Sequence, residues 1–307
     1  MRNHPLLSFL ILAFGISWSI YAIAKWGVGV SSTFGWTAVS ALFMFGPALA
    51  AIILRHGLSM PWRDLGVVRV GIRWKWMGLA VLIPMALPPL TLFFNWMIGD
   101  VLGITAFGHT AVTKTMVLSV LEKQLANSGT AANGALEKLS SLPLNGISLL
   151  VITLITGALA GCTVNFAFAM GEELGWRGML YRYTRGWGLW KHVIFTGTFW
   201  GLWHAPLILE GHNYPDHPGL GVAFMCLLTT ALALPLAWVR FRSHCVWSAG
   251  VFHGTVNGVA GASVLFSQGS TNMLGSTVGI SGILGLVVIG TTLFLFDHQF
   301  RKQFNAG

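Results

Sequence analysis

Three short groups of polar residues stand in apolar surroundings and could together perform acid–base chemistry. They are Glu172-Glu173 with Arg177, Trp200 with His204, and His253 with Asn257. Glu173 and Arg177, Trp200 and His204, and His253 and Asn257 are each four residues apart, which places each pair on one face of a helix. A carboxylate, two imidazoles and a carboxamide are sufficient to activate a water molecule and to stabilise an oxyanion. Histidine and glutamate are equally the ligands of a zinc site with an open position.

The spacing predicts different roles for the two adjacent glutamates. Glu173 and Arg177 are four residues apart and can form an ion pair on one helix face. Glu172 is rotated by about 100° from that face, at 3.6 residues per turn, and lacks this partner. We therefore expect Glu173 to be neutralised structurally and Glu172 to remain free to accept a proton. The alternative is a salt-bridge cluster that caps the cytoplasmic end of a helix.

The composition places these groups in a membrane protein. Of the 307 residues, 54% are hydrophobic and only 9% are charged, and the mean hydropathy is +0.70. A soluble domain averages about 25% charged residues, and no soluble core of this size could hide so much apolar surface. The net charge of +9 comes from basic residues between apolar stretches, which indicates membrane topology and excludes a nucleic-acid surface. Three cysteines without a CxxC pair argue against a disulfide framework or a thiolate metal site.

We expect an all-α polytopic bundle of about eight transmembrane helices, forming one integral membrane domain over residues 1–307. The expected spans are residues 6–26, 36–54, 76–98, 147–183, 190–209, 220–239, 246–266 and 278–296. The fourth to seventh spans, within residues 147–267, would hold the catalytic core. The least hydrophobic part, residues 100–146, would be an extracytoplasmic loop with an amphipathic helix over residues 113–125. Gly201, Gly254 and Gly258 are small and would let helices approach closely.

An even number of spans puts both termini on one side of the membrane. Most of the 18 basic residues then fall on that side, so the positive-inside rule places both termini in the cytoplasm. We expect the plasma membrane of a bacterium as the location.

The three polar groups must also reach one depth. Glu172 and His253 lie in the cytoplasmic parts of their spans, whereas His204 comes about 20 Å into the fifth span at 1.5 Å per residue. We therefore expect the fifth span to begin outside the bilayer or to tilt. A cavity between the fourth, fifth and seventh spans, open to the cytoplasm, would then deliver water.

The loop over residues 211–218 also carries groups that resemble metal ligands, namely His212, Asp216 and His217. The loop is short and rich in Pro and Gly, which favours a solvated turn. It is expected on the side of the membrane opposite Glu172.

Taken in order, the three groups form a family pattern. Glu-Glu-x-x-x-Arg, then aromatic-x-x-x-His, then His-x-x-x-Asn, on successive membrane helices, resembles the CAAX-protease and bacteriocin-processing family. Its members are intramembrane endopeptidases such as the Rce1-type prenyl protease and its bacterial relatives. The resemblance covers about residues 147–267. The second motif usually opens with Phe, where this chain has Trp200.

The resemblance implies a role for each motif residue. Glu172 would act with His204 to activate water, and Glu173 and Arg177 would hold the motif's shape. The oxyanion would be supported by His253 and Asn257, and Trp176, Trp200 and Trp203 are possible walls of the pocket. No cofactor is certain; a Zn²⁺ ion on Glu172, His204 and His253 is the alternative. The implied substrate is a membrane-associated peptide or protein within the lipid bilayer, with no nucleic-acid partner.

Two other functions stay open. Buried glutamate and histidine also serve as proton relays in transporters, although no inverted repeat is visible in this chain. A non-catalytic membrane scaffold, such as one giving immunity to a peptide toxin, could use the same residues for binding alone. In that case His204 would be a satisfied buried histidine, and His253 and Asn257 an interhelical hydrogen-bonding pair.

Overall fold

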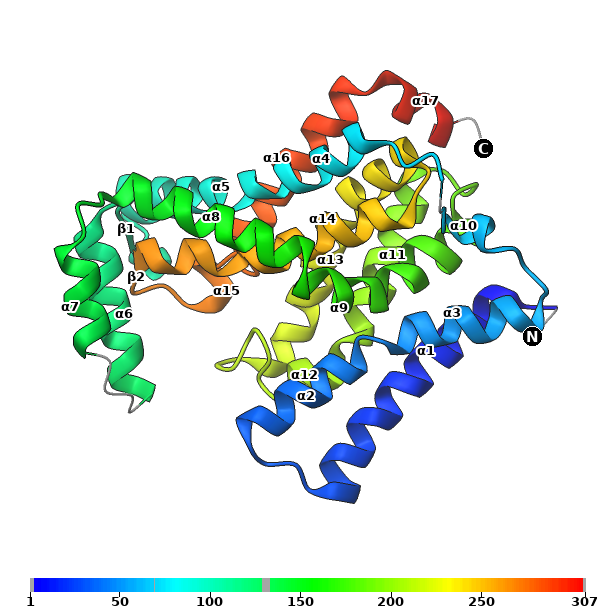
Figure 1. Ribbon diagram of the computed structural model, residues 1–307, viewed down its shortest axis with the longest axis horizontal. Coiled ribbons are helices and arrows are strands. Elements are labelled where there is room, and N and C mark those ends of the chain that lie inside the picture. The colour runs from blue at the N-terminus through cyan, green and yellow to red at the C-terminus, as the bar shows by residue number, and fades with distance from the viewer. Residues whose placement is uncertain (1–2, 69, 129–132, 306–307) are drawn as a thin grey trace.

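The computed structural model describes residues 3–68, 70–128 and 133–305, and helices make up almost all of its regular structure (Figure 1). The first half contains α1 (Pro5–Ala22), η1 (Ile23–Val28), α2 (Thr33–Phe43), α3 (Gly46–Gly57), η2 (Trp62–Leu65), α4 (Trp74–Leu82), η3 (Pro84–Ala86), α5 (Leu87–Asn95), η4 (Trp96–Val101), η5 (Thr105–Phe107), β1 (His109–Thr110), α6 (Lys114–Ser128) and α7 (Asn133–Ser141). The second half contains α8 (Gly146–Cys162), α9 (Val164–Glu173), η6 (Leu174–Leu180), α10 (Tyr181–Thr184), α11 (Leu189–Trp203), α12 (Ala205–Leu209), α13 (Pro218–Ser243), α14 (Val246–Val259), η7 (Ala260–Phe266), β2 (Ser267–Gln268), α15 (Asn272–Gly275), α16 (Ile280–Phe296) and α17 (His298–Asn305). The strands β1 and β2 form an antiparallel pair.

The all-α membrane bundle is confirmed. Within the described ranges, six helical segments are long and apolar enough to cross a membrane, namely Pro5–Val28, Phe34–Gly57, Trp74–Val101, Pro218–Ser243, Val246–Phe266 and Asn272–Phe296. They coincide with the expected first three and last three spans. A pair bent by 118°, Gly134–Ser141 with Gly146–Cys162, would make seven. The expected count of eight and the cytoplasmic termini stay predictions.

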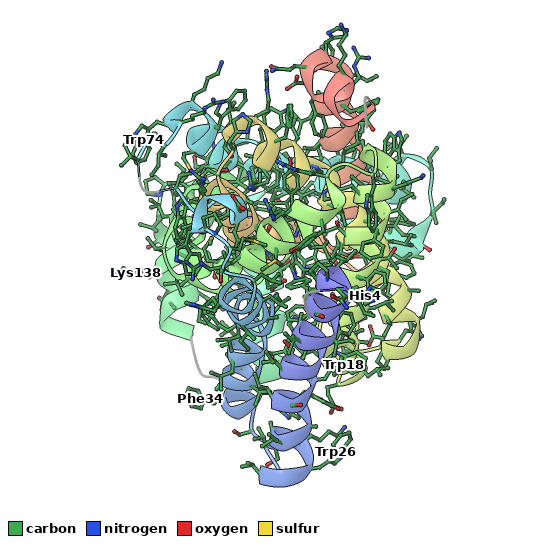
Figure 2. The ribbon with its side chains drawn as sticks, turned by 90° about the vertical axis from the view of Figure 1, so that its right-hand side faces the viewer. His4, Trp18, Trp26, Phe34, Trp74 and Lys138 are labelled. Carbon is green, nitrogen blue, oxygen red and sulfur yellow. The ribbon has the colours of Figure 1, made fainter. Side chains whose placement is uncertain are left out.

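The first two spans form a hairpin that extends away from the rest of the bundle. Trp26 and Phe34 lie toward its far end (Figure 2), and their exposed fractions are 74% and 85%. Large apolar side chains left open on a membrane helix are suited to contact with lipid.

The expected fourth span is broken, so a continuous helix from residue 147 to residue 183 is wrong. Thr163 has φ −120° and ψ −95°, which ends α8 and starts α9 in a new direction. The following turn, η6, is π-helical and carries Arg177. Extra-wide π turns inside helices occur often at functional sites.

The expected fifth span consists of α11 and α12, with His204 at the joint between them. Pro206 has no backbone N–H to continue the helical ladder, and the His204 N–H instead bonds the Gly201 carbonyl in a tighter turn.

Glycines bring the helices of the site together, as expected. A Cβ atom on Gly258 of α14 would lie 2.0 Å from the Gly157 carbonyl oxygen of α8. A Cβ on Gly254 would lie 2.4 Å from the Gly161 carbonyl oxygen, and one on Gly201 would lie 2.4 Å from the Cα of Cys226 in α13. These backbones touch because no side chain separates them.

The region over residues 100–146 folds into short elements at one end of the molecule, with the chain termini toward the other end (Figure 1). Helix α6 covers the expected amphipathic helix. Its place on a membrane surface, like the expected boundaries of the catalytic core, stays a prediction.

Candidate active site

Glu173 is the centre of a buried ionic cluster. Its Oε1 accepts hydrogen bonds from Arg177 Nη1 at 3.0 Å and from His253 Nδ1 at 2.9 Å. All three side chains are buried, with Glu173 0% exposed. The ion pair between Glu173 and Arg177 agrees with the helical spacing. The contact with His253 was not expected. It joins residues 80 positions apart, and no single motif indicates it.

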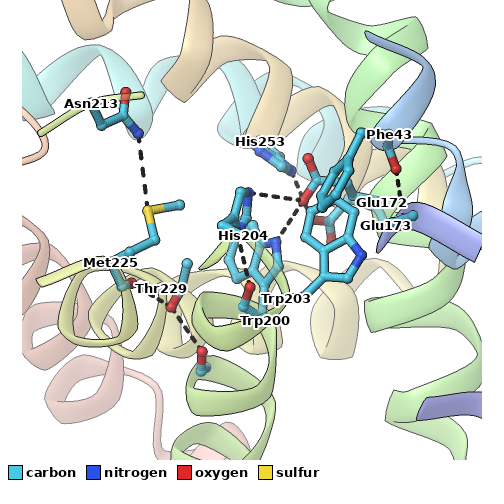
Figure 3. A network of polar contacts seen from close by, with 12 residues as sticks. Phe43, Glu172, Glu173, Trp200, Trp203, His204, Asn213, Met225, Thr229 and His253 are labelled. Carbon is cyan, nitrogen blue, oxygen red and sulfur yellow. Dashed lines mark hydrogen bonds and ion pairs between the residues drawn. The ribbon is translucent and has the colours of Figure 1, made fainter. Parts of the chain in front are cut away.

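Glu172 has a different environment from its neighbour. Its Oε2 accepts a hydrogen bond from Trp200 Nε1 at 2.5 Å and lies 4.0 Å from His204 Nε2 (Figure 3). It is 1% exposed, yet it lines a cavity from which Glu173 is absent. The structure therefore brings Glu172 and His204 together from α9 and from the end of α11, as expected.

The contact made by Nδ1 of His204 fixes the orientation of the ring and the position of its proton. Nδ1 lies 2.8 Å from the Trp200 carbonyl oxygen. A carbonyl only accepts hydrogen bonds, so Nδ1 must carry the proton. In the neutral ring Nε2 is then an acceptor, and this is the nitrogen that faces Glu172.

Trp200 contacts Glu172, Arg177 and His253. Its indole donates to Glu172, its ring lies 4.3 Å from the Arg177 guanidinium, and the His253 ring packs edge-on at 5.2 Å. Cation–π and edge-to-face contacts of this kind fix ring orientation. The sequence predicted a pocket wall here and missed the hydrogen bond. The available signal was a tryptophan, with an N–H, where the resembling family usually has phenylalanine.

A cavity of about 340 Å³ adjoins these side chains. Six of the expected site residues line it: Glu172, Trp200, Trp203, His204, His253 and Asn257. Trp176 does not line it, but packs behind Trp203 with ring centroids 5.8 Å apart. Most of the remaining lining is apolar and comes from α2, α5, α13, α14 and α16. A largely apolar cavity with a few convergent polar groups is the usual form of a ligand site.

The loop after α12 also reaches this cavity, which was not expected from the sequence; the side of the membrane on which the loop lies stays a prediction. His212 and Asn213 are lining residues. The chain turns inward at Gly211, with φ +91°, and at Asn213, with φ +64°. Asp216 and His217 are exposed and outside the lining, so the solvated turn describes only the second part of the loop.

The exposed part of the cavity lining lies on two elements. His212 of the loop and Asn257 of α14 are exposed, and the other lining residues are buried or half-buried.

The residues fit a zinc site poorly. Among the described residues, no three His, Cys, Asp or Glu side chains are grouped so that they could hold a metal ion. Glu172 and His204 face each other, but His253 directs Nδ1 to Glu173. A catalytic zinc normally takes three protein ligands, so a zinc ion here would need His253 Nε2 as its third ligand beside Glu172 and His204.

The fold and site thus define an integral membrane protein with a buried Glu/His centre beside a cavity. Residues 146–259, which contain all three motifs, match the family model described as Type II CAAX prenyl endopeptidase Rce1-like. A stretch of 44 residues is 46% identical to "CAAX prenyl protease 2" of Methanococcus maripaludis. That stretch covers 14% of this chain and 16% of the relative. The resemblance indicated by the motifs is confirmed over this segment. The relative is archaeal, so a bacterial location stays a prediction.

Proposed function

We propose that this protein is an intramembrane endopeptidase that hydrolyses a peptide bond in a membrane-associated peptide or protein. One observation carries the proposal. Glu172 Oε2 and His204 Nε2 face each other across 4.0 Å at the wall of a cavity. This separation is too long for a direct hydrogen bond and suits two groups that share one bridging water. The match to an endopeptidase family supports the same reaction.

In the proposed reaction, Glu172 is the general base. It takes a proton from the shared water while the water oxygen attacks the carbonyl carbon of the substrate. His204 Nε2 accepts the other hydrogen of that water and so orients it. When the C–N bond breaks, the proton held by Glu172 passes to the leaving amine, which leaves a free acid and a free amine.

The oxyanion of the tetrahedral intermediate would be stabilised from α14. Asn257 lines the cavity and can donate through its carboxamide. His253 has Nδ1 on Glu173, which leaves Nε2 for the substrate. With His253 protonated, the positive charges of His253 and Arg177 balance the negative charges of Glu172 and Glu173. The Nε2–H of His253 then becomes a hydrogen-bond donor.

The test is a comparison of membrane peptides from cells that carry the wild type, Glu172→Gln or Glu137→Gln. Glutamine keeps the size of Glu172 and an oxygen for Trp200, but cannot accept the proton. Glu137 is exposed on α7, far along the chain from the site, and serves as the control. We expect cleavage products in the wild type and in Glu137→Gln, and their loss in Glu172→Gln.

Identical peptides in all three strains would contradict the enzyme. If Glu172→Gln then also kept the cellular function, the non-catalytic scaffold would be the better description.

A further inference from the structure

The cavity has a second polar wall that the proposed chemistry does not use. His212 and Asn213 lie on the loop between α12 and α13 and line the cavity together with Glu172 and His204. Figure 3 shows Asn213 across the open space from His204 and His253, beside Met225 of α13.

The backbone holds Asn213 in an unfavourable conformation. Its φ of +64° lies in the left-handed region, which most residues avoid and which asparagine tolerates better. The next residue, Tyr214, is 1% exposed and donates a hydrogen bond to the Val278 carbonyl at 2.7 Å. The loop is therefore anchored, and the strain is kept at a residue that faces the cavity.

The carboxamide of Asn213 has spare hydrogen-bonding capacity. Within the described chain, its hydrogen bond runs from Nδ2 to Met225 Sδ at 4.0 Å, and a thioether is a weak acceptor. The neighbouring lining is apolar and includes Leu228, Leu232 and Leu286. A polar group beside so much apolar surface is costly unless a partner satisfies it.

The lining also restricts the kind of ligand. Among the described residues that line it there is no lysine or arginine, and Glu172 is the carboxylate, so an anionic headgroup or a carboxylate ligand would meet no permanently charged cation. Apolar side chains fit the leucines and valines. A peptide main chain inserted there must find partners for its N–H and C=O groups.

We propose that Asn213, assisted by His212, binds the main chain of an apolar peptide segment across the cavity from Glu172. This inference rests on the proposed function, because the peptide is the substrate of that site. A carboxamide is complementary to a peptide unit, since its NH₂ donates to a carbonyl and its oxygen accepts from an N–H. The second wall thereby orients the scissile bond toward the water held by Glu172 and His204.

Binding can be measured without cleavage in a Glu172→Gln background. The probe is a fluorescein-labelled decapeptide of Leu, Ala and Val with blocked ends, and Kd is measured by anisotropy with the protein in nanodiscs. Asn213→Gly removes the carboxamide and keeps the positive φ, and its melting temperature verifies folding. His212→Ala tests the imidazole. His217→Ala is the matched control, because His217 is exposed on the same loop outside the cavity.

We expect Asn213→Gly to weaken binding about tenfold, the loss of one hydrogen bond in an apolar site. His212→Ala should weaken it less, and His217→Ala not at all. In a series of probes, one backbone amide at a time is replaced by an ester. At one position the replacement should weaken binding to the protein that has Asn213 and leave binding to Asn213→Gly unchanged.

Equal affinity with and without the Asn213 side chain would overturn the inference, as would failure of the probe to bind any variant. Cleavage by the otherwise wild-type protein separates the two proposals. If Asn213→Gly cleaves the probe as well as the wild type does, the enzyme proposal stands and the binding role of Asn213 is contradicted. If binding depends on Asn213 but no probe is cleaved, the binding role stands and the enzyme proposal is contradicted.

Discussion

Two adjacent acids in one helix have separate surroundings in this protein. Glu173 is enclosed by Arg177 and His253, and Glu172 meets an indole N–H and a cavity. Glu173 directs Oε1 to Arg177 and His253 and does not line the cavity, so a water molecule in the cavity does not contact it. The acid beside the cavity is the one that can exchange a proton with water.

Trp200→Phe should lower both kcat and the melting temperature. Phenylalanine keeps the ring near Arg177 and His253 but removes the hydrogen bond to Glu172. Hydrogen bonds to charged groups contribute about 1.5–3 kcal/mol, so kcat should fall by roughly 10- to 150-fold. The measurement is kcat on a cleaved peptide together with the melting temperature.

Trp203→Phe is the matched control for that change. Trp203 lines the same cavity, and its buried Nε1 has no hydrogen-bond partner in the described structure. Losing that N–H should leave kcat within a few-fold of the wild type. Equal losses in both variants would mean that ring packing, and not the bond to Glu172, matters.

At this scale the sequence predicted much of the site. Helical spacing correctly separated Glu172 from Glu173 and paired Glu173 with Arg177. It could not reveal the bond from His253 to Glu173 or the bond from Trp200 to Glu172, because both join different helices. Pairs on one helix follow from spacing alone, whereas pairs between helices depend on how the helices pack.

At the scale of the element, the contact between α8 and α14 positions the site. Gly157 and Gly258 let the two helices touch, which sets the depth of His253 relative to α9. The glycines could be recognised from the sequence, but their partners could not.

Gly258→Ala should impair both stability and activity. The new methyl group would overlap the Gly157 carbonyl and push α14 away from α8. Overpacking of this kind typically costs about 1–3 kcal/mol. Gly261→Ala is the control, since a Cβ there meets nothing within 4 Å. Unchanged melting temperature and activity in Gly258→Ala would show that the contact is not tight.

The breaks in the elements were harder to predict than the elements. The six long apolar segments follow from hydropathy. The joint at His204 had a local signal in Pro206, which could have been used. Thr163 ends α8 without Gly or Pro beside it, although its Oγ1 bonds the Leu159 carbonyl as in a helix interior. That break is set by packing and leaves no mark in the pattern.

At the scale of the whole molecule, the membrane topology decides which side the cavity faces. The positive-inside prediction puts the loop after α12 outside the cytoplasm. His212 of that loop and Asn257 are the exposed residues of the cavity lining, so an entrance at these residues would face away from the cytoplasm, opposite to the expected opening.

This arrangement predicts a labelling pattern in intact cells. With Cys162, Cys226 and Cys245 replaced by alanine, a membrane-impermeant thiol reagent should label His217→Cys but not His56→Cys. Both positions are exposed, and they lie in predicted connections on opposite sides. Labelling of His56→Cys but not of His217→Cys would indicate the opposite topology.

The ionic cluster around Glu173 also sets an order of biogenesis. Ribosomes deliver α9 with both carboxylates well before α14, so the acids enter the membrane while His253 has yet to be synthesised. Until α14 arrives, Glu173 has Arg177 alone, and the oxyanion side of the cavity does not exist. Under the proposed function, the nascent chain would thus be inert for most of its synthesis. The membrane proteins inserted beside it would meet an active site only after α14 is in place.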